Sequence, residues 1–225
     1  RKVIYPSDNP AERLVYENRR YKDPNTGRVP SDMRRKELMF AKTLPISESL
    51  SKSNWSHRGP YNVGGRTRAI ALDVQNEDII LAGGTSGGMF RSTDGGQSWT
   101  MTTDPGQLHN VTCVAQDTRS GHEDTWYFGS GENRGGWLGD VSFLGNGIYK
   151  SIDGGLSWDS LAITTSNTPQ SWDNDFDFVW NIVTDPSNDS MDVVYAAVHG
   201  DIYKSSDGGT SWDKKLGGNN GNNRR

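Results

Sequence analysis

RSTDGGQSW, residues 91–99, recurs as KSIDGGLSW at residues 150–158 and as KSSDGGTSW at residues 204–212. Paired glycines adopt the positive φ angles of tight turns, and an aspartate before them accepts backbone N–H bonds across the turn. The tryptophan offers a large apolar plate to a neighbouring sheet, with its indole N–H bonded to backbone. We therefore predict three structural turns without a catalytic or ligand-binding role, built by Ser92, Asp94, Gly96 and Trp99, by Ser151, Asp153, Gly155 and Trp158, and by Ser205, Asp207, Gly209 and Trp212.

Alternating apolar segments surround each copy and predict β-strands. First strands are expected at 68–74, 110–116 and 178–184, second strands at 78–84, 124–130 and 192–198, and third strands at 88–92, 147–151 and 201–205. A fourth strand begins at each Ser-Trp pair. The motif aspartates stand 59 and 54 residues apart, at positions 94, 153 and 207. Four antiparallel strands at this period predict one β-propeller blade, so we expect an all-β body of about three blades over residues 55–225.

Propellers close with about four to eight blades, because an unclosed array leaves bare strand edges. We therefore expect the protein to continue into further blades beyond these three.

The first 54 residues follow a different pattern. Pro10 is well placed as the first residue of a helix, the segment DPNTG at 23–27 predicts a turn, and a second helix is expected from about Ser31. We assign residues 1–45 to a helical N-terminal arm and residues 46–54 to a linker. The arm has little apolar surface, so it must dock on the β body or on a partner, or remain partly mobile.

Charge and composition exclude several classes of protein. Residues 1–50 have a net charge of +4, whereas residues 51–225 have a net charge of −8 and lack the basic stripe of a nucleic-acid-binding surface. No apolar run approaches the ~20 residues of a membrane span. Cys113 is the single cysteine and is expected to be a buried small hydrophobe.

The motif S-x-D-x-G-x-x-W resembles the Asp-box, or BNR, repeat of sialidases, sortilin-like receptors and xyloglucan-cleaving propeller glycosidases. Three further segments, DPNTGRVP at 23–30, FAKTLP at 40–45 and WSHRGPYNVGGRTRA at 55–69, are similar to large secreted Asp-box propeller proteins of Bacteroidota. This resemblance implies export from a Gram-negative cell by type IX secretion, a C-terminal sorting domain, and a secreted or cell-surface location.

Blade two carries an insertion at 129–147, where the other blades have short turns. Such an insertion rises over the ligand-bearing face of a propeller, and its residues suit sugar stacking and polar contacts. The alternative, which we favour, is a loop that covers this face or packs on a further blade. With one residue from a second segment at 170–180, the ligand-binding candidates are Glu132, Arg134, Trp137, Phe143 and Trp172.

The second segment also contains Asp173, Asp175 and Asp177, whose carboxylates could hold calcium. Because the spacing lacks the glycine and terminal glutamate of an EF-hand loop, we favour a solvated loop, and no cofactor is expected.

Glycoside hydrolysis requires two carboxyl groups about 5 to 9 Å apart, and Glu132 with Asp140 is the best candidate pair. The arginine triad of sialidases is missing, and the four histidines have no zinc-binding spacing. We therefore favour a non-catalytic propeller that scaffolds, binds or mediates adhesion, with surface proteins, secretion-system proteins or glycans as partners. The alternatives are a glycoside hydrolase of the Asp-box propeller type and a sortilin-like peptide receptor.

Overall fold

The computed structural model describes residues 10–28, 30, 33–44, 65–107, 110–134, 141–168 and 171–217. The chain separates into two compact units, Arg1–Trp55 and Ser56–Arg225. Neither of the helices described in the first unit is long and apolar enough to cross a membrane.

The first unit contains two helices, α1 (Pro10–Tyr21) and α2 (Met33–Thr43). Between them, Asp23 Oδ1 accepts the backbone N–H of Asn25 at 2.7 Å, and Gly27 has a φ of +66°. The helix start at Pro10 and the turn therefore match the sequence pattern. The bounds of the arm and linker, and docking of the arm, stay predictions.

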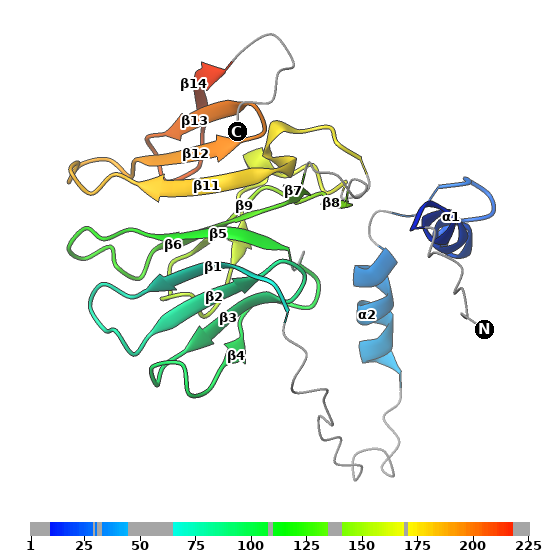
Figure 1. The fold of residues 1–225 in the computed structure, drawn as a ribbon, viewed down its shortest axis with the longest axis horizontal. Helices are drawn as coiled ribbons and strands as arrows, with labels where there is room; N and C mark the ends of the chain where they lie inside the picture. The colour runs from blue at the N-terminus through cyan, green and yellow to red at the C-terminus, as the bar shows by residue number, and fades with distance from the viewer. Residues whose placement is uncertain are drawn as a thin grey trace, which may run out of the picture. The chain divides into compact units, whose positions relative to one another are not determined.

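The described part of the second unit contains three four-stranded antiparallel sheets, the blades of a partial β-propeller (Figure 1). Blade one consists of β1 (Thr67–Leu72), β2 (Ile80–Gly84), β3 (Gly88–Ser92) and β4 (Thr100–Met101). Blade two consists of β5 (Val111–Gln116), β6 (Trp126–Ser130), β9 (Ile148–Ser151) and β10 (Asp159–Ser160). Blade three consists of β11 (Val179–Thr184), β12 (Val194–Val198), β13 (Asp201–Ser205) and β14 (Asp213–Gly217).

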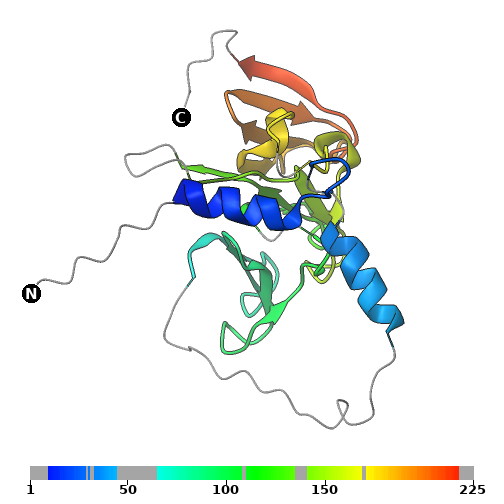
Figure 2. The same cartoon turned by 90° about the vertical axis from the view of Figure 1, so that its right-hand side faces the viewer.

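A separate hairpin of β7 (Glu132–Arg134) and β8 (Val141–Phe143) is inserted between β6 and β9. Two short 3-10 segments, η1 (Ala162–Thr164) and η2 (Asp175–Asp177), lie between blades two and three along the chain. Figure 2 shows blade one and blade three on opposite sides of blade two. Each main strand overlaps the segment predicted for it, so the all-β propeller prediction is confirmed.

The first strands of the blades, β1, β5 and β11, lie side by side and form the inner row of the unit. We call the end at which they begin the start face, and the opposite end the turn face. The repeated DGG turns lie at the turn face, whereas the β7–β8 hairpin lies at the start face. Each inner strand also contains a register shift near its beginning, at Arg68, Thr112 and Trp180.

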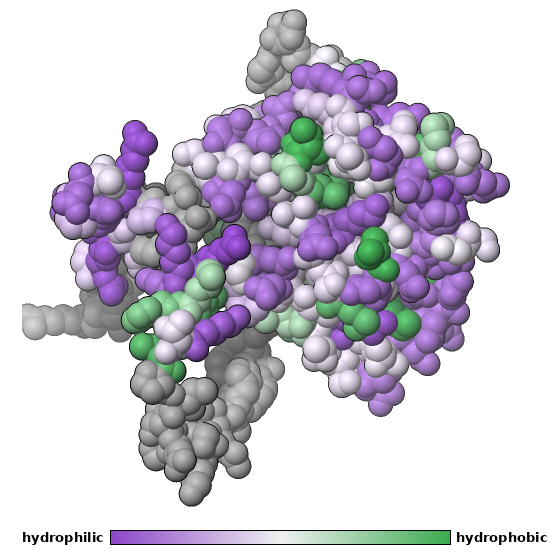
Figure 3. All heavy atoms as spheres, turned by 180° about the vertical axis from the view of Figure 1, so that it is seen from behind, coloured by the Kyte–Doolittle hydropathy of each residue, from purple (hydrophilic) through white to green (hydrophobic). Residues whose placement is uncertain are grey.

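The core lies between neighbouring blades. One buried cluster, which includes Leu81, Met89 and Phe128, joins blades one and two, and a second, which includes Tyr127 and Ile182, joins blades two and three. The view in Figure 3 shows a mainly hydrophilic surface with small separate apolar patches on the β unit.

Cys113 lies in the second cluster with 7% of its surface exposed. Burial raises the pKa of its thiol to about 12, so the side chain behaves as a small hydrophobe. The prediction for this residue is confirmed.

The DGG turns repeat one hydrogen-bond pattern. In blade one, Ser92 Oγ donates to Asp94 Oδ1 at 2.7 Å and accepts the N–H of Gly96 at 2.9 Å. The same aspartate accepts both the N–H and the hydroxyl of Ser98, at 2.8 and 2.6 Å. The turns of blades two and three repeat these bonds with distances of 2.6 to 3.0 Å. Each carboxylate therefore holds its own turn, and the absence of a ligand-binding role stays a prediction.

The first glycine of each turn donates a hydrogen bond to the connection between the first and second strands of the same blade. The N–H groups of Gly95, Gly154 and Gly208 donate to the carbonyls of Asp78, Asp124 and Asp192, which precede the second strands. Bonds also cross between blades, because the Gly154 and Gly208 carbonyls accept from side chains of the blade before: from Arg91 Nε at 2.9 Å, and from Lys150 Nζ at 3.2 Å.

The three motif tryptophans differ in burial. Trp158 is 5% exposed, contacts Phe128 edge-on at 4.7 Å, and donates its indole N–H to Thr102 of blade one at 3.0 Å. Trp212 is partly buried against the second cluster, whereas Trp99 is 41% exposed. Trp212 and Trp99 donate their indole N–H groups within their own turns, each to the carbonyl of the second glycine of its motif. Trp158 therefore packs against the preceding blade, and Trp99 has no preceding blade among the described residues.

Blade one has a further uncovered apolar face. Ile70 and Leu72 are 67% and 57% exposed, on the face of β1 opposite the buried Ala69. Together with the exposed Trp99, these side chains form a surface suited to packing against another sheet. The expected continuation into further blades stays a prediction.

Trp158→Ala in the 225-residue chain is expected to lower the free energy of unfolding by ~3–5 kcal/mol, since it removes a buried ring from the joint between two blades. Trp99→Ala is the matched control and should cost under about 1 kcal/mol, because its ring is partly exposed. Urea unfolding followed by circular dichroism measures both values. Equal losses in the two variants would contradict the assignment of Trp158 to the joint.

The turn aspartates should also make stability depend on pH. Hydrogen bonds from the Ser98 hydroxyl and N–H lower the pKa of Asp94 from 3.8 to about 2, and Ser211 does the same for Asp207. Because the folded pKa lies below the unfolded value, this stabilisation is present above about pH 4 and is lost as the pH falls towards about 2. The urea midpoint should fall across this window, and Asp94→Asn with Asp207→Asn should flatten the fall. Asp189→Asn, at an exposed position outside the turns, should leave the slope unchanged.

Candidate functional site

The β7–β8 hairpin brings two predicted site residues to the start face. Glu132 pairs in register with Phe143, which is 39% exposed, and Asn110 Nδ2 donates to the carbonyl of Leu144 just beyond, at 2.9 Å. The backbone of Arg134 pairs with that of Val141, but its side chain is outside the described part of the structure. Trp137 and Asp140 lie outside the described residues, so the proposed pairing of Glu132 with Asp140 stays a prediction.

Glu132 is an ion-paired side chain with 1% of its surface exposed. Arg66 approaches it as a fork, with Nη1 donating to Oε1 at 2.8 Å and Nη2 lying 2.8 Å from Oε2. Only the first of these contacts has the alignment of a hydrogen bond. Arg68 Nη1 lies 3.7 Å from Oε1. The carboxylate therefore joins the insertion of blade two to the beginning of β1.

Trp172 is an exposed aromatic residue at the start face, with 57% of its surface exposed. Its ring lies 4.6 Å from that of His199, in the β12–β13 turn, and 5.8 Å from that of Phe178, just before β11. Both contacts are edge-on, and Phe178 is buried. The two neighbours thus support the indole while more than half of its surface remains available.

The aspartates after Trp172 are each bonded within the protein. Asp173 Oδ2 accepts the Thr168 hydroxyl at 2.6 Å, and Asp175 Oδ2 accepts the Tyr203 hydroxyl at 2.7 Å. Asp177 accepts two backbone N–H groups, one of them as the reciprocal bond of the capping box at η2. Burial raises its pKa, and the nearby charges of Asp173 and Asp175 add to this rise. These bonds favour the structural interpretation of the segment over a calcium site.

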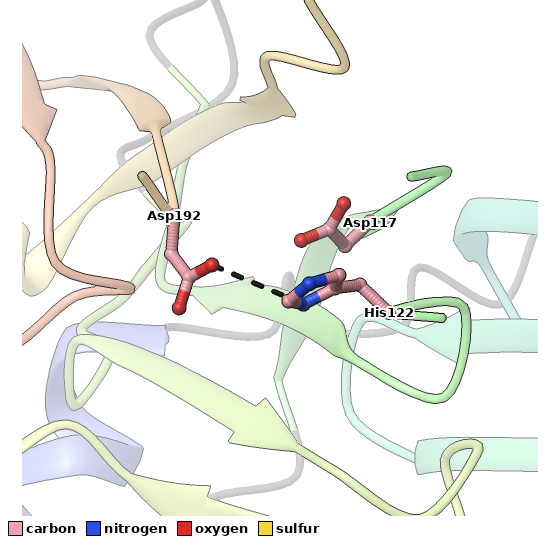
Figure 4. Close-up of side chains that lie close together, drawn as sticks. All are labelled: Asp117, His122 and Asp192. Atoms are coloured by element: carbon pink, nitrogen blue, oxygen red, sulfur yellow. Dashed lines mark ion pairs between the residues drawn. The ribbon is translucent and has the colours of Figure 1, made fainter. Parts of the chain in front are cut away.

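A different cluster lies at the turn face. Asp117 and His122, from the β5–β6 connection, and Asp192, from the β11–β12 connection, place potential metal-ligand atoms within 4.8 Å of one another (Figure 4). It is the one such group found among the described residues. His122 Nδ1 lies 3.9 Å from Asp192 Oδ1.

Arg119 occupies this cluster. Its Nη2 lies 2.5 Å from a carboxylate oxygen of Asp117 and 2.5 Å from one of Asp192, and its Nη1 donates to the carbonyls of Asn188 and Met191. Burial acts to raise the pKa of Asp117, but the bonds and charge of Arg119 outweigh it and hold that pKa below its usual value. A metal ion would have to displace this guanidinium, so the arrangement is better suited to clamping blade two to blade three.

Sequence patterns gave no sign of these long-range pairs. Nothing in the local sequence points from Arg66 or Arg68 to Glu132, and the blade-three partners of Arg119 stand 69 to 73 residues further along the chain. The local pattern D-x-R could indicate the Asp117–Arg119 contact, since both side chains belong to one connection. His199 offered no signal, because its contact with Trp172 depends on the turn between two strands.

Comparisons with known proteins match this fold to xyloglucan-cleaving enzymes. No family model matches the chain. The chain is 27% identical over 193 residues to xyloglucanase Xgh74A of Acetivibrio thermocellus, an alignment that covers 75% of this chain and 21% of the relative. The chain thus spans about a fifth of the length of the curated relative it matches.

Two solved structures have the same fold in part. A GH74 xyloglucanase from Xanthomonas campestris matches with a TM-score of 0.50 at 21% identity, over 68% of this chain and 21% of that one. An ancestral GH74 enzyme matches with a TM-score of 0.50 at 24% identity, over 68% of this chain and 18% of that one. These likenesses show a shared propeller fold.

The Arg119 clamp yields a stability prediction. Arg119→Met should lower the free energy of unfolding by ~3–5 kcal/mol, because it leaves Asp117 buried without its partner. Adding Asp117→Asn should recover part of this loss, since the uncompensated charge is removed. Urea unfolding measures both variants. A melting temperature that rises with added Zn²⁺ or Ca²⁺ in the unaltered chain would instead show that the cluster holds a metal ion.

Proposed function

We propose that this chain is the glycan-binding part of a secreted or cell-surface propeller and does not itself contain a complete hydrolytic site. The observation that carries the proposal is the supported but exposed ring of Trp172 at the start face. Aromatic rings with a polar edge suit sugars, which present an apolar face and a rim of hydroxyl groups. Phe143 adds a second exposed ring on the inserted hairpin.

The state of Glu132 favours binding over hydrolysis. A hydrolytic pair needs one carboxyl group to donate a proton and another to act on the sugar ring or on a water molecule. Glu132 is buried and its carboxylate is held in an ion pair by Arg66. It is therefore better suited to positioning the hairpin than to general acid catalysis.

Xyloglucan is the first glycan to consider, because the curated relative is a xyloglucanase. The Asp-box motif and the segments shared with secreted Bacteroidota proteins support export from a Gram-negative cell, by type IX secretion. In that setting the chain would act as a binding, scaffold or adhesion component, with surface or secretion-system proteins as further partners.

A second candidate is a glycoside hydrolase of which this chain is one part. The identity to the xyloglucanase favours it, and the short coverage of that relative allows the catalytic carboxylates to come from other blades. The two candidates differ in one measurable property, the release of reducing ends from xyloglucan.

Trp172→Ala is expected to weaken binding of a xyloglucan oligosaccharide about tenfold or more, because it removes the stacking ring. Calorimetric titration measures the affinity, and urea unfolding should show little change in stability. Trp99→Ala, an exposed tryptophan on the turn face, is the matched control and should bind normally.

A reducing-end assay on the full-length protein tests the second candidate. The binding proposal expects no turnover, whereas hydrolysis abolished by Glu132→Gln would overturn it. If binding survives Trp172→Ala but is lost in Trp137→Ala, the ring on which the sugar stacks belongs to the blade-two insertion.

A further inference from the structure

Two arginines at the beginning of β1 share one buried carboxylate. Arg66 makes the close forked contact with Glu132, at 2.8 Å to each oxygen, whereas Arg68 only approaches Oε1 at 3.7 Å. No described residue accepts a hydrogen bond from Arg68. Within this part of the chain, its contact with Glu132 is an ion pair without a hydrogen bond, so the N–H donors of its guanidinium remain available.

A β-bulge accounts for the position of Arg68. The β1–β2 register passes from Thr67 to Ala69, so that Arg68 is left outside the ladder. Bulges commonly redirect a side chain near a functional site. The equivalent bulge residue of blade two, Thr112, bonds to the carbonyls of Gly129 and Val179 and joins two blades. In blade one the same position carries a cation without such a partner.

The charges of this group do not balance. Two guanidinium groups face one carboxylate, which leaves a net charge of about +1 beside the start face. The side chains of Arg66 and Arg68 are 47% and 44% exposed, so their outer N–H groups can be reached from solvent. Guanidinium groups bind carboxylate and other oxyanions through two parallel hydrogen bonds.

We propose that Arg68, assisted by the outer edge of Arg66, binds an anionic group of a sugar, a carboxylate or a sulfate. The inference rests on the proposed function, because it assigns an acidic glycan to the face that presents Trp172. The ring packs on the apolar face of one sugar and the guanidinium holds the charge of another. Glu132 is a positioning residue here, since it fixes Arg66 and fills the inner side of the pair.

The test compares three oligosaccharides of similar length by calorimetric titration: an oligogalacturonate, a sulfated galactan and neutral xyloglucan. We expect one of the two anionic ligands to bind at least tenfold more tightly than the neutral one at low salt, and to lose that advantage in Arg68→Gln. The ligand that shows it identifies the anionic group. Lys215→Gln is the matched control, because it removes one positive charge at a similarly exposed position, 49% against 44%.

The outcomes separate the two proposals. Equal binding of neutral and anionic ligands that is lost in Trp172→Ala but unchanged in Arg68→Gln overturns the anionic site and retains glycan binding. Anionic binding that is lost in Arg68→Gln but survives Trp172→Ala retains the anionic site and overturns the tryptophan platform. If neither anionic oligosaccharide binds measurably, the proposed acidic-sugar site is wrong. It is also wrong if the only Arg68-dependent binding is that of a peptide with a free C-terminal carboxylate.

Discussion

The hydrogen bonds of one aspartate in each DGG turn are the interaction on which the β unit depends. A turn that reverses the chain in so few residues leaves several backbone N–H groups without strand partners, and each would be costly if left unpaired. The carboxylates of Asp94 and Asp207 each accept one backbone N–H and two serine hydroxyls, and the first serine of each motif accepts two further N–H groups. Because the turn is satisfied internally, its outer surface can pack against the blade before it.

The start face follows from the same arrangement. Turns fixed at one end leave the opposite end free to vary, and there the connections differ most between blades. Blade two carries the β7–β8 hairpin, blade three carries η2 and Trp172, and blade one begins with two arginines. Glu132 connects the blade-two hairpin to the arginines at the beginning of blade one. Repeated turns at one end of the blades and differing connections at the other are expected when binding residues are placed on loops over a rigid scaffold.

Periodicity was sufficient to predict the strands and the motif turns, because alternation and glycine pairs reflect local backbone preferences. It was not sufficient for the contacts of the site. The pairing of Arg66 with Glu132 spans 66 residues, and the burial of that carboxylate depends on an insertion folding back over β1. The same reason explains why the tryptophans could not be ranked by burial in advance. Trp158 and Trp99 have the same local sequence, and only the presence of a neighbouring blade distinguishes them.

The locality of the turn bonds has a consequence for how the chain is made. Every carboxylate bond within a DGG turn joins residues no more than four positions apart, and the strands it connects are neighbours in sequence. A blade can therefore take shape as soon as its own stretch of chain, on the order of 50 to 60 residues, has emerged from the ribosome. The apolar face that packs against the next blade is then exposed to solvent only until the following repeat has folded. Assembly in this order would limit the time for which the apolar faces of the blades are exposed to other chains.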